Sequence, residues 1–303
     1  MKLLAASIHH KLDNNKYSFF VLDHDTNKII KAIPHTPDLD PIIYDTTDIR
    51  LIFRPFGIAQ GMGKIFIASN QRIVSFDAKT FAQIGVVSSS GVPNTHQIAY
   101  YDECLYRTNS SNDSITKIDL NSLEETHYCF KTMGQVGSLT MPTGDADNVM
   151  HFNSITIYDG LVYILSHNRK SASKIYVMDL DLTAVIDTID LPGQEFHEIL
   201  IHEGYLYSLG SAGGMLIKIK MDTGFIEKVD LVNPFKYFLR GAFIKDNKLI
   251  AFGNKKFAMI YDKNDTTALE LSIDLDTNEI QRRIVPELSV ITSIQIYQDT
   301  MVQ

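Results

Sequence analysis

The chain has 303 residues, 45% of them hydrophobic and 21% charged, which is typical of a globular protein able to bury a sizeable core. This composition excludes disordered and fibrous proteins. The formal net charge is −8 and no run of Lys or Arg occurs, so a nucleic-acid partner is not expected, because phosphate binding needs a cationic patch.

The N-terminal apolar stretch, residues 3–8, is too short for a signal-peptide core or a membrane span. Cys104 and Cys129 form no CxxC pattern, so we expect reduced thiols and no disulfide framework. These features predict a cytoplasmic protein without a membrane partner.

In chain order, the first expected strands span residues 1–6, 17–22 and 28–33. Residues 1–6 align with residues 247–252, the second strand of a later repeat, so the chain begins inside a repeat. The two strands that follow them are then the third and fourth strands of that repeat.

A strand hairpin recurs next, because apolar residues alternate on either side of a turn-type pair such as Asp159-Gly160. Glycine suits such turns because it accepts positive φ without a clash. The aligned segments are residues 54–70, 94–110, 151–167, 195–211 and 238–254, and a sixth begins at Val290. The central apolar residues of their first strands, called anchors below, are Ile58, Ile98, Ile155, Ile199, Ala242 and Ile294.

An apolar-Asp-x-x-Thr-like turn follows most hairpins and predicts two further strands in each repeat, because Asp and Thr side chains bond nearby backbone amides. Its aspartates are Asp23, Asp77, Asp119, Asp179 and Asp274. Two repeats are longer, with an extended loop expected near residues 130–150 and a lengthened hairpin at 255–267.

These elements predict an all-β fold, a six-bladed β-propeller with four antiparallel strands per blade. One C-terminal strand pairs with the three N-terminal strands and closes the ring, which removes the exposed edges of an open sheet. We therefore expect Leu4 beside Ile294, and a single domain spanning residues 1–303.

Polar residues gather at the strand beginnings, where the first strand of a propeller blade lines the central channel. Two residues before the anchors, at position −2, stand Phe56, His96, Asn153, His197, Arg240 and Thr292. At position −1 stand Gly57, Gln97, Ser154, Glu198, Gly241 and Ser293. At the ends of the second strands, on the same face, stand Asn70, Asn109, His167, Asn168, Ser211 and Asn254.

We expect these side chains to form a ligand site at the channel mouth. His197, Glu198 and His96 are the candidate catalytic residues, since imidazole and carboxylate groups serve as general bases, and they are also the candidate ligands of one divalent metal ion. The candidate ligand-binding residues are Arg240, Asn153, His151, His167, Gln97 and Asn70. The alternative is that polar side chains in the channel only hold ordered water.

Arg240 is the one cation of this inner ring and suits a bidentate contact with a carboxylate or phosphate of a ligand. The alternative for Arg240 is an ion pair with Glu195 or Glu198 of the fourth repeat.

Residues 197–207 and 153–163 resemble blades of the NHL-type and the gluconolactonase/strictosidine-synthase-like six-bladed propellers. In the lactonases a Glu and Asn or Asp residues hold a divalent cation, and the resemblance implies that role for Glu198 and Asn153. The chain also resembles the streptogramin-lyase propellers, in which a His and a metal at the mouth promote elimination.

The sequence therefore predicts a propeller that binds a small polar ligand and acts on it as a hydrolase or lyase, with or without a metal. The alternative is a non-catalytic interaction scaffold with a protein partner, which predicts an exposed apolar patch on one face or on the 130–150 insert.

Overall fold

The computed structural model describes residues 1–8, 17–34, 56–69, 72–88, 95–139, 149–168, 171–211, 214–231, 237–255, 268–285 and 290–298. This part of the chain forms strands and turns, and contains no helix that could cross a membrane. The predicted hairpin at residues 255–267 lies outside the described residues except for Lys255. The predicted ligand-binding residue Asn70 also lies outside them.

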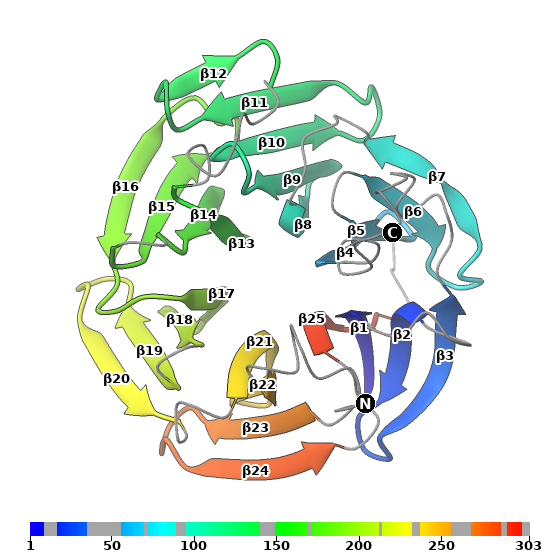
Figure 1. The fold of residues 1–303 in the computed structure, drawn as a ribbon, viewed down its shortest axis with the longest axis vertical. Coiled ribbons are helices and arrows are strands. Elements are labelled where there is room, and N and C mark those ends of the chain that lie inside the picture. Colours follow the sequence, from blue (N-terminus) through cyan, green and yellow to red (C-terminus); the bar gives the residue numbers. More distant parts are fainter. Residues whose placement is uncertain are drawn as a thin grey trace, which may run out of the picture. The chain divides into compact units, whose positions relative to one another are not determined.

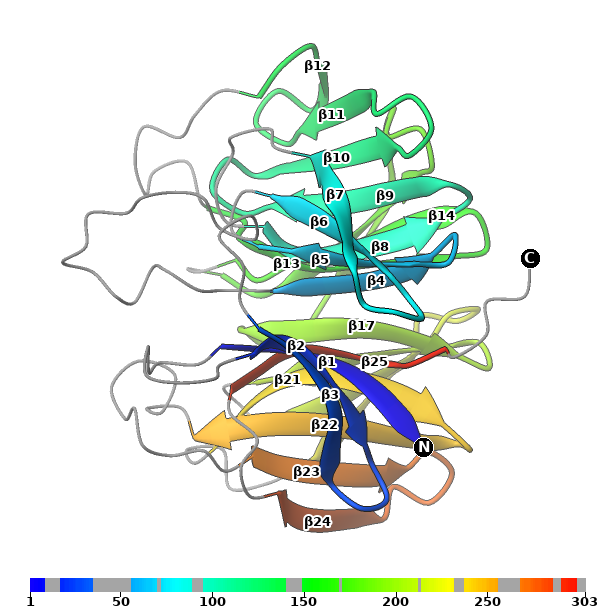
Figure 2. The same ribbon diagram turned by 90° about the vertical axis from the view of Figure 1, so that its right-hand side faces the viewer.

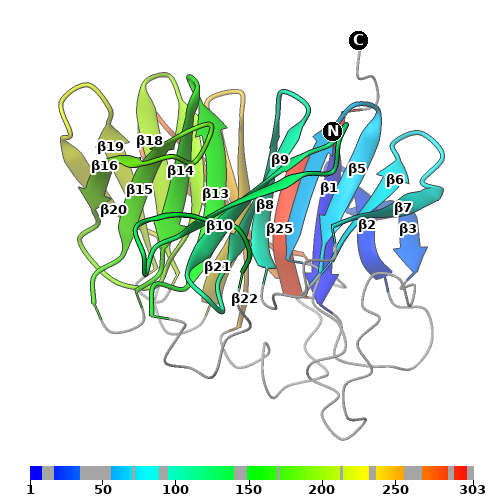
Figure 3. The same cartoon turned by 90° about the horizontal axis from the view of Figure 1, so that it is seen from above.

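Six antiparallel sheets form the blades of a β-propeller, which confirms the predicted fold class (Figure 1). Blade 1 contains β4 (Gly57–Gly61), β5 (Lys64–Ala68), β6 (Ile73–Asp77) and β7 (Gln83–Ser88). Blade 2 contains β8 (Thr95–Tyr101), β9 (Cys104–Asn109), β10 (Ser114–Asp119), β11 (Glu125–Cys129) and β12 (Gly134–Val136). Blade 3 contains β13 (Phe152–Tyr158), β14 (Leu161–Ser166), β15 (Lys174–Asp179) and β16 (Val185–Asp190), side by side in Figure 3.

The other three blades repeat this plan. Blade 4 contains β17 (Phe196–His202), β18 (Tyr205–Gly210), β19 (Met215–Lys220) and β20 (Ile226–Asp230). Blade 5 contains β21 (Tyr237–Lys245), β22 (Lys248–Lys255), β23 (Ala268–Asp274) and β24 (Ile280–Val285). Blade 6 contains β25 (Val290–Ile296), β1 (Lys2–Ile8), β2 (Tyr17–Asp23) and β3 (Lys28–Pro34).

Blade 6 joins the two ends of the described chain. Its strand order is β25-β1-β2-β3, so one C-terminal strand pairs with three N-terminal strands as predicted (Figure 2). Ala5 lies opposite Ile294 and Leu4 opposite the adjacent Gln295. The predicted neighbours therefore share this blade.

Blade 2 differs from the prediction at the start of the 130–150 insert. The loop expected there contains β12, which pairs with β11 through Gly134, Gln135 and Val136. The Gln135 side chain then donates to the carbonyl oxygen of Asp181 in the turn of blade 3. This part of the insert is a fifth strand, because β11 offers an open edge for pairing.

The turns follow their local chemistry as predicted. Both residues of the turn pairs Asp159-Gly160 and Glu203-Gly204 have positive φ, as the tightest hairpin turns require. In the outer turns, each aspartate accepts backbone hydrogen bonds from its own turn. Asp77 Oδ1, for example, accepts from the amides of Lys79 and Thr80. These bonds favour the carboxylate, and the amide of Thr80 is the main cause of the lowered pKa of Asp77.

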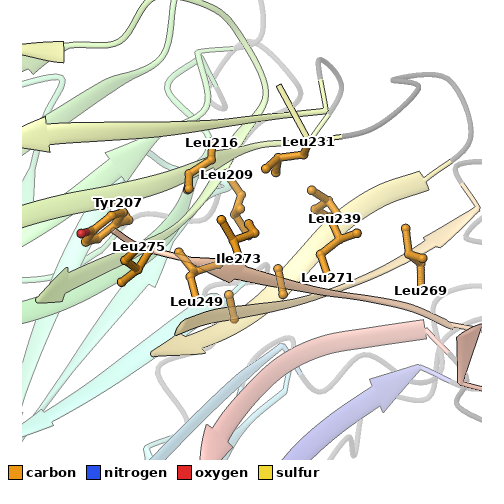
Figure 4. Close-up of a cluster of buried hydrophobic side chains, with 12 residues drawn as sticks. Tyr207, Leu209, Leu216, Leu231, Leu239, Leu249, Leu269, Leu271, Ile273 and Leu275 are labelled. Carbon is orange, nitrogen blue, oxygen red and sulfur yellow. The ribbon is translucent and has the colours of Figure 1, made fainter. Parts of the chain in front are cut away.

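Apolar side chains of adjacent blades pack together to form the core. In one such cluster Leu209 and Leu216 of blade 4 meet Leu239, Leu249 and other apolar side chains of blade 5 (Figure 4). Burial of each such leucine contributes about 1.5–3 kcal/mol to folding.

The chain divides into two compact units. One unit contains blades 1 to 3, and the other contains blades 4 to 6. Each of the side-chain clusters described below lies within one unit.

Candidate functional site

The first strands of blades 2 to 5 are irregular where the polar residues stand. In blade 4 the pairing of β17 with β18 shifts register between His197 and Leu200, and Glu198 has a positive φ of 62°. In blade 5 the shift falls between Arg240 and Ala242, and Gly241 has a φ of 63°. Such bulges re-aim side chains, and they are common beside functional sites. The regular alternation expected from the sequence therefore ends at these positions.

Side chains at position −1 connect one blade to the next. Gln97 Oε1 of blade 2 accepts hydrogen bonds from the hydroxyl of Ser154 (2.6 Å) and the amide of Ile155 (2.8 Å) in blade 3. Glu198 Oε1 of blade 4 accepts from the amide of Gly241 (3.1 Å) in blade 5. Gln97 and Glu198, predicted as site residues, thus also hold neighbouring blades in register.

Side chains twelve residues after the anchor make a second set of connections between blades. Ser110 donates to the carbonyl oxygen of Phe152, and Ser211 donates to that of Leu239. Asn254 Oδ1 accepts from the amide of Ile291 (3.2 Å). All three partners lie three residues before the anchor of the following blade. These hydrogen bonds to the following blade therefore explain why polar residues recur at this position of the repeat.

Rings at position −2 contact the ring four residues before the next anchor. His197 meets Phe238 with ring centroids 4.9 Å apart and planes at 72°, and His96 meets His151 at 4.7 Å and also 72°. The same edge-to-face contact therefore occurs between blades 4 and 5 and between blades 2 and 3.

The first group of these residues, called the His197 cluster, comprises His197, Phe238 and Arg240. The Arg240 guanidinium carbon lies 5.1 Å from the centroid of the Phe238 ring, a cation–π distance. An imidazole and a guanidinium are therefore arranged about one aromatic ring. His197 is 5% exposed, so its ring is largely desolvated.

The hydrogen-bond partners of His197 Nδ1 favour one tautomer of the ring. A serine hydroxyl has one proton, and Ser211 donates it to Leu239, so Ser211 Oγ accepts from His197 Nδ1 at 2.8 Å. Nδ1 also lies 3.2 Å from the carbonyl oxygen of Glu195, which can only accept. In the neutral ring Nδ1 therefore carries the proton and Nε2 the lone pair.

The second group, called the His96 cluster, comprises Phe56, His96, His151 and His167 from blades 1 to 3. Phe56 and His96 stack with centroids 4.7 Å apart, and His151 meets His167 at 5.3 Å. The structure thus brings together three histidines that are distant in the sequence. Asn153, two residues after His151 in the sequence, is buried.

The predicted metal ligands are divided between the two units, with His96 in one and His197 and Glu198 in the other. Within the described residues, no three His, Cys, Asp or Glu side chains are grouped in a way that could hold a metal ion. Metal binding remains a prediction.

Arg107 was not among the sequence candidates, although its side chain is fully buried in blade 2. It donates to Ser88 Oγ (3.2 Å), which in turn donates to Glu125 (2.5 Å). Burial lowers the pKa of Arg107 to about 10. The repeat alignment could have indicated Arg107, because it stands at the position that Ile67 and Ile164 occupy in the first and third repeats.

No protein-family model and no curated protein sequence matches this chain. Solved structures do resemble it. A chain of the nidogen/laminin complex is 11% identical with a TM-score of 0.67 and covers 99% of both chains. A protein of unknown function from Bacteroides caccae is 9% identical, with a TM-score of 0.66 and 97% of both chains covered.

A third similar structure is the Cps50 (Swd1) β-propeller domain from Myceliophteria thermophila. It is 8% identical with a TM-score of 0.55, and the match covers 88% of this chain and 79% of that one. Identities this low establish the propeller fold alone.

Proposed function

We propose that this propeller binds a small polar ligand at the His197 cluster and that His197 acts on it as a general base, in a hydrolysis or an elimination. The observation that carries this proposal is the pair of oxygens near Nδ1, Ser211 Oγ at 2.8 Å and the carbonyl oxygen of Glu195 at 3.2 Å, because a proton on Nδ1 leaves Nε2 as the basic atom. Ser211 and Glu195 maintain that tautomer through their contacts with Nδ1.

In this proposal Arg240 holds an anionic group of the ligand, a carboxylate or phosphate, by a bidentate contact. Phe238 contacts both His197 and Arg240, so it sets the separation between the base and the bound anion. Glu198 acts as a positioning residue, since its bond to Gly241 fixes the backbone next to Arg240.

The resemblance to lactonase and streptogramin-lyase propellers supports this pair of reactions, because both are ones that a single positioned base promotes. Asn153 and the His96 cluster remain predicted contributors to ligand binding. A general base accounts for about 100-fold to 10,000-fold of a rate, so the role of His197 is measurable.

The test measures acid release from 6-phosphoglucono-δ-lactone and dehydration of malate, two probes that carry an anionic group, by the wild-type protein, His197→Gln and His202→Gln. His202 is the matched control because it lies at the opposite end of β17. We expect turnover with at least one probe, a loss of about 100-fold in His197→Gln, and no change in His202→Gln. Equal rates for His197→Gln and wild type would overturn the proposal.

Arg240→Lys tests the anion contact separately. Lysine keeps the charge but loses the bidentate geometry, so we expect weaker binding of malate with the His197 tautomer unchanged. Binding that is as tight as in the wild type would remove Arg240 from the proposed site.

The second candidate function is the interaction scaffold, favoured by one observation. Met133 and Val149, described residues on the two sides of the 130–150 insert, are each 58% exposed. One similar structure is a chain of a complex between nidogen and laminin, and a protein partner is a proposal for this chain too. If the wild-type protein neither binds malate nor converts either probe, this function becomes the better account.

A further inference from the structure

Asp113 lies in the short connection between β9 and β10 of blade 2 and is 2% exposed. Its carboxylate accepts hydrogen bonds from three consecutive backbone amides at the start of blade 3. Oδ2 accepts from Val149 (2.9 Å), and Oδ1 accepts from Met150 (3.0 Å) and His151 (3.1 Å). This carboxylate therefore joins two blades at the residue that carries one ring of the His96 cluster.

The backbone of Asp113 is attached to the other side of the same insert. The amide of Phe130, directly after β11, donates to the carbonyl oxygen of Asp113 at 3.0 Å. Phe130 is the first residue of the 130–150 insert, and Val149 is the first described residue after residues 140–148. A single residue thus holds the chain at both ends of the insert.

His151 needs such support because its backbone is unfavourable. Its φ is 51°, in the left-handed region that costs a non-glycine residue about 1–2 kcal/mol. In this conformation its ring lies between His96, at 4.7 Å, and His167, at 5.3 Å. The position of the ring follows from the backbone that Asp113 binds.

The electrostatics of Asp113 favour a specific role over general stabilisation. Burial raises the pKa of its carboxyl, and the bonds from Met150, Val149 and His151 only partly offset this. A raised pKa means that ionising this carboxyl costs more in the folded protein than in the unfolded chain. Groups retained at such a cost are concentrated at functional sites.

We propose that Asp113 is the positioning residue of the His96 cluster: it holds the amides of residues 149–151 and thereby sets the His151 ring against His96 and His167. This proposal does not rest on the proposed function. The placement of the ring is a property of the protein alone.

The test compares Asp113→Asn with Asp119→Asn by nitrogen–proton NMR of the imidazole rings, with each signal assigned by single His→Gln variants. Asn places an NH2 group where one carboxylate oxygen accepts, so at least one of the hydrogen bonds from the amides of residues 149–151 is lost. Asp119 is the matched control because its Oδ1 accepts from the amides of Asn121 and Ser122 in an outer turn.

In Asp113→Asn we expect the signals of His151, His96 and His167 to move, while those of His24, His197 and His202 stay. In Asp119→Asn all of them should stay. Unchanged signals of His151, His96 and His167 in a folded Asp113→Asn protein would overturn the proposal.

A measurement on the wild-type protein covers the case in which Asp113→Asn does not fold. Although the Val149 side chain is 58% exposed, the proposal predicts slow hydrogen exchange at the amides of Val149, Met150 and His151. In a folded Asp113→Asn protein, exchange should be about tenfold faster or more, the factor for losing a bond to a charged group. Rapid exchange of these amides in the wild type would contradict their hydrogen bonds to Asp113, whether or not any ligand binds.

Discussion

Histidines with similar burial serve different purposes in this protein, and their hydrogen-bond partners decide which. His197 Nδ1 faces the carbonyl oxygen of Glu195 and the Oγ of Ser211, whose own proton goes to Leu239, so the lone pair of the neutral ring is on Nε2. His127, on β11, has Nδ1 3.0 Å from Thr116 Oγ1 and Nε2 3.7 Å from Glu125. Strand periodicity could predict that His197 stands at a strand beginning, but not its tautomer, because Ser211 and Leu239 are distant in the sequence.

Stability should depend on the protonation of His127. Burial lowers its pKa below the ordinary value of 6.5, an effect that Glu125 opposes. A lowered pKa means that the unfolded chain binds the proton more readily, so this contribution is present above about pH 6.5 and is lost as the pH falls.

Urea unfolding at about pH 7.5 and about pH 5.5 measures this dependence. The wild-type protein should lose more stability over that interval than His127→Gln, by at most about 1.4 kcal/mol per pH unit. A control, His202→Gln, should keep the wild-type slope. If His127→Gln and wild type lose equal stability, the buried ring does not contribute to the pH dependence.

At the scale of elements, turns were predictable and bulges were not. The turn pairs and the aspartate turns depend on residues next to one another, so Asp159-Gly160 and Asp77 appear as the sequence indicated. The bulge at Glu198 and the strand β12 depend on partners in another strand or blade. Alternation within one segment contains no information on such partners.

The turn at Gly160 allows a test of backbone strain without a packing effect. Gly160 has a φ of 72°, and an added Cβ would meet no atom within 4 Å. Gly160→Ala should therefore lower the free energy of unfolding by about 1 kcal/mol through conformation alone.

Gly85→Ala is the matched control, since Gly85 also has open space around it but no positive φ. Chemical denaturation of both variants makes the comparison, and Gly85→Ala should be neutral or slightly stabilising. Equal destabilisation by the two substitutions would show that φ at Gly160 is not the cause.

At the scale of the whole molecule, the repeat made six blades and their closure predictable. The repeat did not show that adjacent polar positions make different contacts with the next blade, because these positions look alike in the sequence. Gln97 and Glu198 bond the next blade, whereas the rings of His96 and His197, one residue earlier, pack against aromatic rings of the next blade. This difference depends on contacts between blades, which the periodicity of a sequence does not describe.

The connections between blades should contribute to stability. Gln97→Leu keeps the size of the side chain but removes the acceptor of the Ile155 amide, so we expect a loss of about 1–3 kcal/mol. Gln281→Leu, on the exposed face of β24, is the control and should change stability by less than about 0.5 kcal/mol. Urea denaturation of the two variants measures both effects, and similar midpoints would show that the bond of Gln97 is not a stabilising contact.

The tautomer of His197 tests the central claim most directly, because the proposed chemistry depends on a basic Nε2. Nitrogen NMR of the wild-type protein at neutral pH distinguishes a protonated from an unprotonated ring nitrogen. The account predicts a proton on Nδ1 and a lone pair on Nε2, with that preference weakened in Ser211→Ala. A neutral His197 ring with its proton on Nε2 would contradict it.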